Sequence, residues 1–281
     1  MLGAIIGDIV GSVYEWNNNK TKDFPFFRDD CFFTDDTVMT CAAAEAIMNG
    51  GQKEDFIDAM KKYGRMYPDA GYGARFGNWV DGDDREPYNS FGNGSAMRFS
   101  PCAWRLDATT EDLPSEVKRL AQLSAEVTHN HPEGIKGAMA TSDAIFMCRY
   151  YFGGYSGDYG KPVNDNPMEC KRLIKEHIEQ EYGYNLSQTL DEIRPTYRFN
   201  ETCQDTVPQA IIAFLESTDF EDAIRNAISL GGDSDTLAAI TGSIAEAAYG
   251  IPDWIKEKAY TYLDEPLKDV LKQWEEMIVI K

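Results

Sequence analysis

The stretch Asp233-Ser234-Asp235-Thr236 leads into a run of small and apolar residues, Leu237 to Tyr249, that predicts a buried helix. The same arrangement occurs near the start of the chain, where Thr34-Asp35-Asp36-Thr37 precedes the apolar run Val38 to Met48. The simplest interpretation of each cluster is a helix cap, because Asp and Thr oxygens accept the free N–H groups of a first helical turn. One cap needs one such side chain, however, and each cluster supplies two carboxylates and at least one hydroxyl.

The four carboxylates of these two clusters would repel one another if the fold brought them together. Like charges about 4 Å apart repel by roughly 4 kcal/mol at an effective dielectric constant of 20. Divalent cations remove that cost, and carboxylate and hydroxyl oxygens suit Mg²⁺, Mn²⁺ or Ca²⁺ better than Zn²⁺. Because four Asp charges balance two divalent ions, the clusters predict a two-metal site, with two independent caps as the alternative.

The composition is that of a globular protein. The chain has 281 residues, of which 43% are hydrophobic and 12% aromatic, so one large domain or two small ones are both possible. The apolar stretches are too short for a membrane span, and Asp8 interrupts the first of them too early for a signal peptide. We therefore expect a cytoplasmic protein with no membrane partner.

The charge argues against a nucleic-acid-binding protein, and the cysteines and histidines argue against a zinc protein. With 27 basic and 47 acidic residues the formal net charge is −20, so general nucleic-acid binding is not expected, whereas a cationic group such as a guanidinium would be attracted. The six cysteines form no CxxC pair, and only three histidines are present, which leaves little material for a Cys/His zinc site.

Hydrophobic periodicity predicts an all-α fold. Apolar residues recur at intervals of three and four, as in Phe56, Met60, Tyr63 and Tyr67. Two closing amphipathic helices are predicted over 253–263 and 266–278. A glycine-rich segment, 153–160, with the residues that follow it to 167, is the best candidate linker. Because the acidic clusters lie on opposite sides of it and would have to meet, we expect a single domain.

Three smaller motifs carry chemistry. The segment Gly3 to Ser12 has small residues at 3, 4, 7 and 11, which would let another helix approach closely, and Glu15 follows it. In Ser90-Phe91-Gly92-Asn93-Gly94-Ser95, alternate glycines let backbone N–H groups turn toward an anion, although a turn with capping chemistry is the commoner use. In Thr128-His129-Asn130-His131, a hydrogen-bonded polar histidine is favoured over a metal ligand.

Together these motifs make the chain resemble the ADP-ribosylglycohydrolase family, which includes the dinitrogenase-reductase-activating glycohydrolase and the ADP-ribosyl-arginine and ADP-ribosyl-serine hydrolases. The resemblance runs nearly from end to end. It comprises, in order, Gly7-Asp8-x-x-Gly11 with Glu15, Phe33-Thr34-Asp35-Asp36-Thr37, Gly92-Asn93-Gly94-Ser95-Ala96-Met97-Arg98, Thr128-His129 and Gly231-Gly232-Asp233-Ser234-Asp235-Thr236.

The resemblance implies a single compact all-α domain over 1–281 with two Mg²⁺ or Mn²⁺ ions in an ADP-ribose cleft. The metal ligands that it implies are Thr34, Asp35, Asp36, Asp233, Asp235 and Thr236. The substrate-binding residues that it suggests, most of them around the diphosphate, are Ser90, Gly92, Asn93, Gly94, Ser95, His129 and Tyr72. Glu15 matches a family acid and is the candidate base, with Asp36 and Asp235 as the other catalytic residues. Asp69 is the nearest candidate for a further family aspartate.

The predicted function is therefore metal-dependent hydrolysis that removes ADP-ribose from a modified protein side chain, with arginine as the first choice of acceptor and a monomer as the expected state. The alternative is a non-catalytic ADP-ribose-binding or structural relative, which would have a damaged ligand set. A phosphatase of the haloacid-dehalogenase type would need Asp233-Ser234-Asp235 at the end of a strand, whereas residues 221–230 read as a helix.

Overall fold

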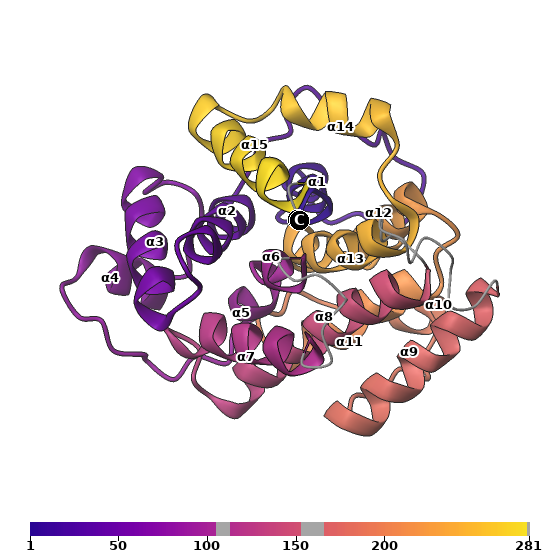
Figure 1. The fold of residues 1–281 in the computed structure, drawn as a ribbon. Coiled ribbons are helices and arrows are strands. Elements are labelled where there is room, and N and C mark those ends of the chain that lie inside the picture. The colour runs from indigo at the N-terminus through magenta and orange to yellow at the C-terminus, as the bar shows by residue number, and fades with distance from the viewer. Residues whose placement is uncertain (105–112, 153–165, 280–281) are drawn as a thin grey trace.

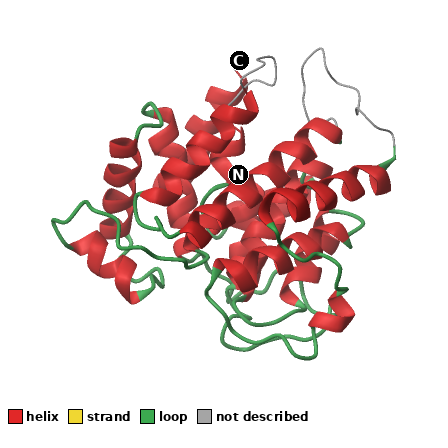
Figure 2. Cartoon of the chain, turned by 90° about the horizontal axis from the view of Figure 1, so that it is seen from below, coloured by secondary structure: helices red, strands yellow, loops and turns green. Residues whose placement is uncertain are grey.

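Helices form the framework of the protein. The computed structural model describes residues 1–104, 113–152 and 166–279, and over those residues it has helices and connecting loops but no strand (Figures 1 and 2). The prediction of an all-α fold is confirmed. The candidate linker at 153–160 lies outside the described residues.

Two helices far apart in the sequence pack together at the centre of the molecule: α1 (Leu2–Gly11) and α13 (Ser234–Tyr249) (Figure 1). The small residues of α1 face α13 so closely that a Cβ atom on Gly7 would lie 2.0 Å from the backbone oxygen of Ala238. On Gly11, a Cβ atom would lie 2.5 Å from the Cα of Asp235. Close helix approach was predicted from the sequence, and the structure identifies α13 as the partner.

The first acidic cluster is carried by α2 (Asp35–Met48), which packs against α1, α3 (Lys53–Met66) and the last helix, α15 (Glu265–Val279). The short helix α4 (Ala74–Asp81) follows α3 and packs against it. Figure 1 shows α2, α3 and α4 on one side of the central pair.

The opposite side is built around α8 (Pro132–Tyr151), which packs against α7, α11 and α13. The remaining helices are α5 (Gly94–Met97), α6 (Ser100–Trp104), α7 (Leu113–Glu126), α9 (Pro167–Tyr182), α10 (Leu190–Ile193), α11 (Cys203–Leu215), α12 (Phe220–Ile228) and α14 (Asp253–Tyr260). Among the described helices, none combines the length and apolar character that a bilayer crossing requires.

Helix starts bring both acidic clusters to the same region. Thr34 is the N-cap of α2, and its side chain accepts a hydrogen bond from the backbone N–H of Asp36. Asp233 precedes α13 without making a side-chain capping bond. The capping interpretation therefore describes Thr34 but not Asp233. Because the second cluster follows helix α12 and begins α13, the strand that a haloacid-dehalogenase site would need is missing from this part of the described chain.

Candidate functional site

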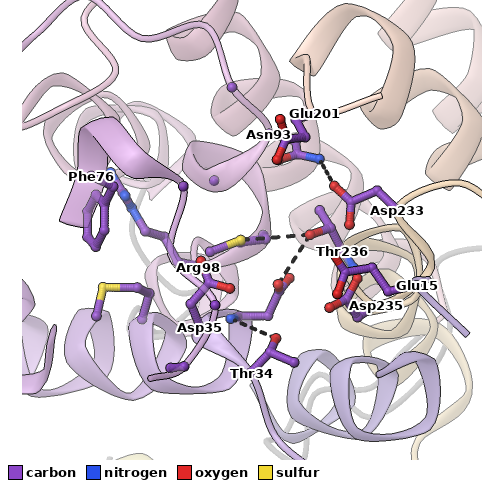
Figure 3. A pocket seen from close by; sticks show the side chains of 18 of the residues that line it. Glu15, Thr34, Asp35, Phe76, Asn93, Arg98, Glu201, Asp233, Asp235 and Thr236 are labelled. Atoms are coloured by element: carbon purple, nitrogen blue, oxygen red, sulfur yellow. Dashed lines mark hydrogen bonds between the residues drawn. The ribbon is translucent and has the colours of Figure 1, made fainter. Parts of the chain in front are cut away.

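A cavity of about 440 Å³ opens where the two acidic clusters meet (Figure 3). All six predicted metal ligands contribute to its lining: Thr34, Asp35, Asp36, Asp233, Asp235 and Thr236. Glu15 lines the same cavity, and Figure 3 shows its side chain beside Asp235. The fold thus brings together two groups of residues that are about two hundred positions apart in the chain.

The carboxylates fall into two overlapping sets that are compact enough to hold a cation. Asp8, Asp36 and Asp235 each place a carboxylate oxygen within 4.8 Å of the other two. Glu15, Asp233 and Asp235 form a second set of the same size. Asp235 belongs to both, so among the described residues it is the side chain positioned to bridge two neighbouring cation sites. Asp35 is half-buried and lines the cavity but belongs to neither set.

Asp8 is a member of this cluster that the sequence analysis did not assign to the site. Its carboxylate is fully buried and accepts bonds from the backbone N–H and the hydroxyl of both Thr34 and Thr37. The Thr34 hydroxyl lies 2.6 Å from Asp8 Oδ1. Asp8 therefore fastens the start of α2 to α1. Its place in the Gly7-Asp8-x-x-Gly11 motif was the available signal.

Burial and mutual repulsion make these acids difficult to ionise without a counter-charge. Burial, with the neighbouring charges of Asp8 and Asp35, raises the pKa of Asp36 well above its usual range. Burial and the Asp233 and Asp36 carboxylates do the same to the pKa of Asp235. A bound cation would reverse this effect, because it stabilises the ionised form of each carboxylate.

The donor set fits a divalent cation. Asp36 Oδ1 is a buried atom with no hydrogen-bond partner among the described residues, which is a costly arrangement for a carboxylate unless a cation binds it. The other oxygen of Asp36 accepts a hydrogen bond from the Thr236 hydroxyl at 3.2 Å. The surrounding ligand atoms are carboxylate and hydroxyl oxygens, the donors that Mg²⁺, Mn²⁺ and Ca²⁺ prefer.

Glu15 lies just beyond the end of α1, on the loop that leads to α2. Its carboxylate is half-buried, and burial together with the charges of Asp233, Asp8 and Glu201 raises the pKa of Glu15 to about 7. An acid at the cavity edge whose pKa is near neutrality can accept and release a proton at physiological pH.

The glycine-rich loop lies against the second acidic cluster. Ser90, Gly92, Asn93 and Gly94 line the cavity. The Asn93 side-chain amide donates to Asp233 Oδ2 at 2.7 Å, which connects the loop to the start of α13 (Figure 3). Gly92 also forms a single antiparallel bridge with Thr202. This bridge places the loop beside residues 199–202.

Two of the predicted substrate-binding side chains, Ser95 and Tyr72, are outside the cavity lining. The Ser95 hydroxyl is buried and donates to the backbone oxygen of Gly134 at 2.8 Å, so it ties the loop to α8. The Tyr72 ring packs against Phe76, with 5.4 Å between the ring centroids. The family resemblance suggested both residues, but their side chains turn into the protein.

His129 lines the cavity at the end of a chain of polar contacts from Arg98. The Arg98 guanidinium is buried and donates to Thr128 Oγ1 at 2.9 Å, and that hydroxyl lies 2.7 Å from His129 Nδ1. The Thr128 hydroxyl thus connects the Arg98 guanidinium to the imidazole ring of His129. Burial and the charges of Arg98 and Arg75 lower the pKa of His129 well below its usual value, so the ring is neutral.

Arg98 is a buried cation whose hydrogen bonds, among the described residues, go to neutral groups. Its contacts are the backbone oxygen of Ser124, at 2.8 Å, and Thr128. Burial lowers the pKa of Arg98 to about 10, so the group remains cationic at neutral pH. It gives the cavity a positive end opposite the acidic cluster (Figure 3).

The remaining lining includes residues that the sequence analysis did not assign: Trp16, Phe32, Arg75, Tyr88 and Glu201. Asp69, the candidate for a further family aspartate, is exposed and lines the same cavity. The Trp16 side chain is 80% exposed, and its ring stacks on Phe199 with 5.0 Å between centroids. Loop residues such as these follow no periodic pattern, so the sequence offered no signal for most of them.

Comparison with known proteins identifies relatives along the whole chain. A family model described as ADP-ribosylglycohydrolase matches residues 1–279. An ADP-ribosylhydrolase ARH3 from Mus musculus is 24% identical over 314 residues, which cover 89% of this chain and 83% of the relative. The ADP-ribosylarginine hydrolase Tri1 from Serratia proteamaculans (strain 568) is 25% identical and covers 98% of this chain and 75% of its own length.

Two further matches agree with these. The ADP-ribosyl-[dinitrogen reductase] glycohydrolase of Rhodospirillum rubrum is 25% identical over 78% of this chain and 70% of its own. A solved structure described as an ADP-ribosylglycohydrolase-related protein complex superposes with a TM-score of 0.60 at 22% identity, over 99% of this chain and 94% of that one. The superposition on this solved structure shows that the two chains share a fold.

Proposed function

The chain belongs to the ADP-ribosylglycohydrolase family and is a glycosidic-bond hydrolase, and we propose that it removes ADP-ribose from modified arginine side chains with the help of two divalent cations. The observation that carries the proposal is the pair of overlapping carboxylate sets that share Asp235. The unpartnered oxygen of Asp36 supports it, because that oxygen points to a positive ligand. Mg²⁺ and Mn²⁺ are the cations that suit these donors.

Asp36, Asp235 and Thr236 would hold the cations together with Thr34, Asp35 and Asp233. Cations bound there would supply Lewis acidity, polarising ribose hydroxyls and the attacking water. Cleavage at the anomeric carbon passes through an oxocarbenium-like state, so a group that removes a proton from water is needed on one side of the sugar. Asp36 and Asp235 would also relay that proton.

Glu15 is our candidate for the base. Its carboxylate lines the cavity beside Asp235, where it could accept a proton from the attacking water. The rest of the nucleotide would extend along the glycine-rich loop. Gly92 and Gly94 keep this face of the loop free of side chains next to His129 Nε2, and the Gly92 N–H donates to Ser90 Oγ at 3.1 Å, so Gly94 and the Ser90 side chain would meet the diphosphate.

Arginine is the acceptor that suits the mouth of the cavity. Asp69 and Glu201 are exposed carboxylates in the lining, and the face of Trp16 is accessible to a planar cation. A guanidinium is attracted by both features, whereas the hydroxyl left by a serine acceptor carries no charge. Tri1, whose name records arginine as its acceptor, is one of the relatives that cover most of this chain.

Release of ADP-ribose from defined substrates tests the proposal. Peptides carrying ADP-ribosyl-arginine or ADP-ribosyl-serine are incubated with the protein in EDTA, in Mg²⁺ and in Mn²⁺. We expect release from the arginine peptide in either cation and none in EDTA. Preference for the serine peptide would reject the acceptor, and full turnover in EDTA would reject the cation requirement.

The alternative of a non-catalytic relative makes a separate prediction. Such a protein would bind ADP-ribose without releasing it from any peptide. The described site has an intact set of carboxylates, so nothing in it favours that alternative.

We further propose that residues 1–281 act as one domain and that the protein is a monomer in the cytoplasm. Size-exclusion chromatography would test the oligomeric state, and cell fractionation would test the location.

A further inference from the structure

The loop that carries Glu15 is fastened to the segment of the second acidic cluster by Asn18, with further bonds from Lys20 and Ser234. Asn18 joins this loop to Gly232, the residue immediately before Asp233. These contacts hold the backbone at Glu15 against the residue that precedes the cluster.

Asn18 uses both ends of its amide in these contacts. Its Oδ1 accepts the backbone N–H of Gly232 at 2.8 Å, and its Nδ2 lies 3.0 Å from the oxygen of the same residue. Nδ2 also lies 3.0 Å from the backbone oxygen of Tyr14 and 2.7 Å from that of Glu15. One amide thus holds the peptide unit of Glu15 on one side and that of Gly232 on the other.

Glycine is needed at position 232 for this arrangement. Gly232 has a φ of 75°, in the left-handed region. A Cβ atom there would lie 2.8 Å from the Tyr197 ring. The conformation turns both the N–H and the oxygen of Gly232 toward Asn18. The polar pairing therefore depends on the backbone shape of the Gly231-Gly232 turn.

The cluster side of this contact is held by other bonds as well. Asp233 accepts from Asn93, and Lys20, two residues after Asn18 on the Glu15 loop, donates to the backbone oxygen of Leu230. Asp235 lies in the first turn of α13, which is packed against α1. Of these side chains, Asn18 is the one that contacts the backbone oxygen of Glu15 itself, so loss of its amide would release Glu15 before the aspartates. The buried aspartates would stay in place.

We propose that Asn18 is a positioning residue that sets the Glu15 carboxylate against Asp233 and Asp235. This inference rests on the proposed function, because it takes Glu15 to act on the attacking water. Displacement of a catalytic group by about 1 Å can cost roughly a hundredfold in rate. Asn18 itself lies outside the cavity lining and needs no contact with substrate.

Two substitutions and one matched control test the proposal by steady-state kinetics in saturating Mn²⁺. Asn18→Ala removes the amide, and Asn18→Asp keeps its shape but sets a carboxylate against three backbone oxygens. We expect each to lower kcat at least about tenfold, within the roughly 10²–10⁴ that a general base supplies, with KM and Mn²⁺ affinity little changed. Asn17→Ala, at the exposed neighbouring residue, should keep wild-type kcat.

A double-mutant cycle with Glu15→Gln separates this role from a general structural one. If Asn18 acts through Glu15, Asn18→Ala should lower kcat less than about twofold in the Glu15→Gln protein. A full second loss there would overturn the proposal, as would a loss of Mn²⁺ affinity equal to the loss of kcat. Wild-type turnover of Glu15→Gln alone would instead reject the proposed role of Glu15, and this inference with it.

Discussion

Asp8 and Asp36 are both buried aspartates of one cluster, yet their surroundings give them different roles. Asp8 accepts bonds from two backbone N–H groups and two hydroxyls, so the fold itself fills its hydrogen-bonding capacity, although burial still raises its pKa. Asp36 has one oxygen bonded to Thr236 and the other without a partner in the described residues. We infer that Asp8 serves stability and that Asp36 serves cation binding.

This contrast predicts opposite effects of the same substitution. Asp36→Asn should stabilise the cation-free protein, because it removes one of several mutually repelling carboxylates, while abolishing most activity. Each kcal/mol relieved would raise Tm by about 2–4 °C. Asp8→Asn should cost about 2–3 kcal/mol, since an amide cannot accept all four bonds. Thermal melts in EDTA would measure both effects, and a lower Tm for Asp36→Asn would contradict the repulsion argument.

His129 predicts a pH dependence of stability. Its pKa in the fold lies well below the ordinary 6.5, because of burial and the charges of Arg98 and Arg75. The unfolded chain therefore binds a proton at this residue as the pH falls through about 6.5, and the folded chain does not. The stability that comes from keeping His129 neutral is present above that pH and is lost below it.

His129→Gln removes this titration. Between pH 7.5 and 5.5, the unfolding free energy of the wild type should fall more steeply than that of the variant, by up to about 1.4 kcal/mol per pH unit below 6.5. Urea denaturation at several pH values, with Mg²⁺ at saturation in every sample, measures the difference. Parallel curves for the two proteins would show that His129 is not held neutral.

Sequence patterns predicted side chains whose type and spacing already imply chemistry, such as Asp233 and Asp235. They did not predict Trp16 or Glu201, which reach the cavity from loops. The family resemblance placed Ser95 and Tyr72 in the substrate site, but the side chains of residues close in sequence can point in opposite directions. Tertiary contacts decide that direction, as the bond from Ser95 to Gly134 illustrates.

At the scale of elements, the contact between α1 and α13 positions the cluster. Asp8 lies between Gly7 and Gly11 on α1, and Asp235 lies in the first turn of α13. The small-residue spacing predicted a close approach by some helix. The spacing does not identify the partner helix, because any helix with small residues on its contact face could pack there. In α13, Gly242 lies opposite Gly3.

Gly7→Ala should therefore destabilise the protein strongly. The new methyl group would lie 2.0 Å from the oxygen of Ala238 and 2.2 Å from its carbonyl carbon, and a helix backbone cannot move aside as a flexible side chain can. We expect a loss of about 3 kcal/mol or more in unfolding free energy, with weaker cation binding because the two helices separate. Urea denaturation and Mn²⁺ titration would measure these changes.

Gly77→Ala is the matched control, because Gly77 also lies inside a helix but has open space around it within 4 Å. The same methyl group should there leave stability unchanged or raise it by up to about 1 kcal/mol, through the better helix propensity of alanine. Equal effects of the two substitutions would mean that helix propensity, and not the contact between α1 and α13, determines the result.

At the scale of the whole molecule, helix starts from the two ends of the sequence converge on one acidic centre. The net charge of −20 adds a general repulsion that any salt would screen, whereas the carboxylate sets would respond only to cations that bind them. The all-α class followed from periodicity alone. The meeting of Asp36 with Asp235 depends on long-range packing, and the sequence supplied only the chemical reason to expect it.

Divalent cations should consequently stabilise the fold by specific binding. Mg²⁺ at a hundred times its dissociation constant would add about 2.7 kcal/mol to the unfolding free energy for each site. Calorimetric titration should find two ions per chain, and thermal melts should show a higher Tm in Mg²⁺ than in NaCl of equal ionic strength. Asp235→Asn, which removes the shared ligand, should lose most of this gain. An equal rise in NaCl, or an unchanged rise in Asp235→Asn, would mean that general screening and not bound cations holds the acidic centre together.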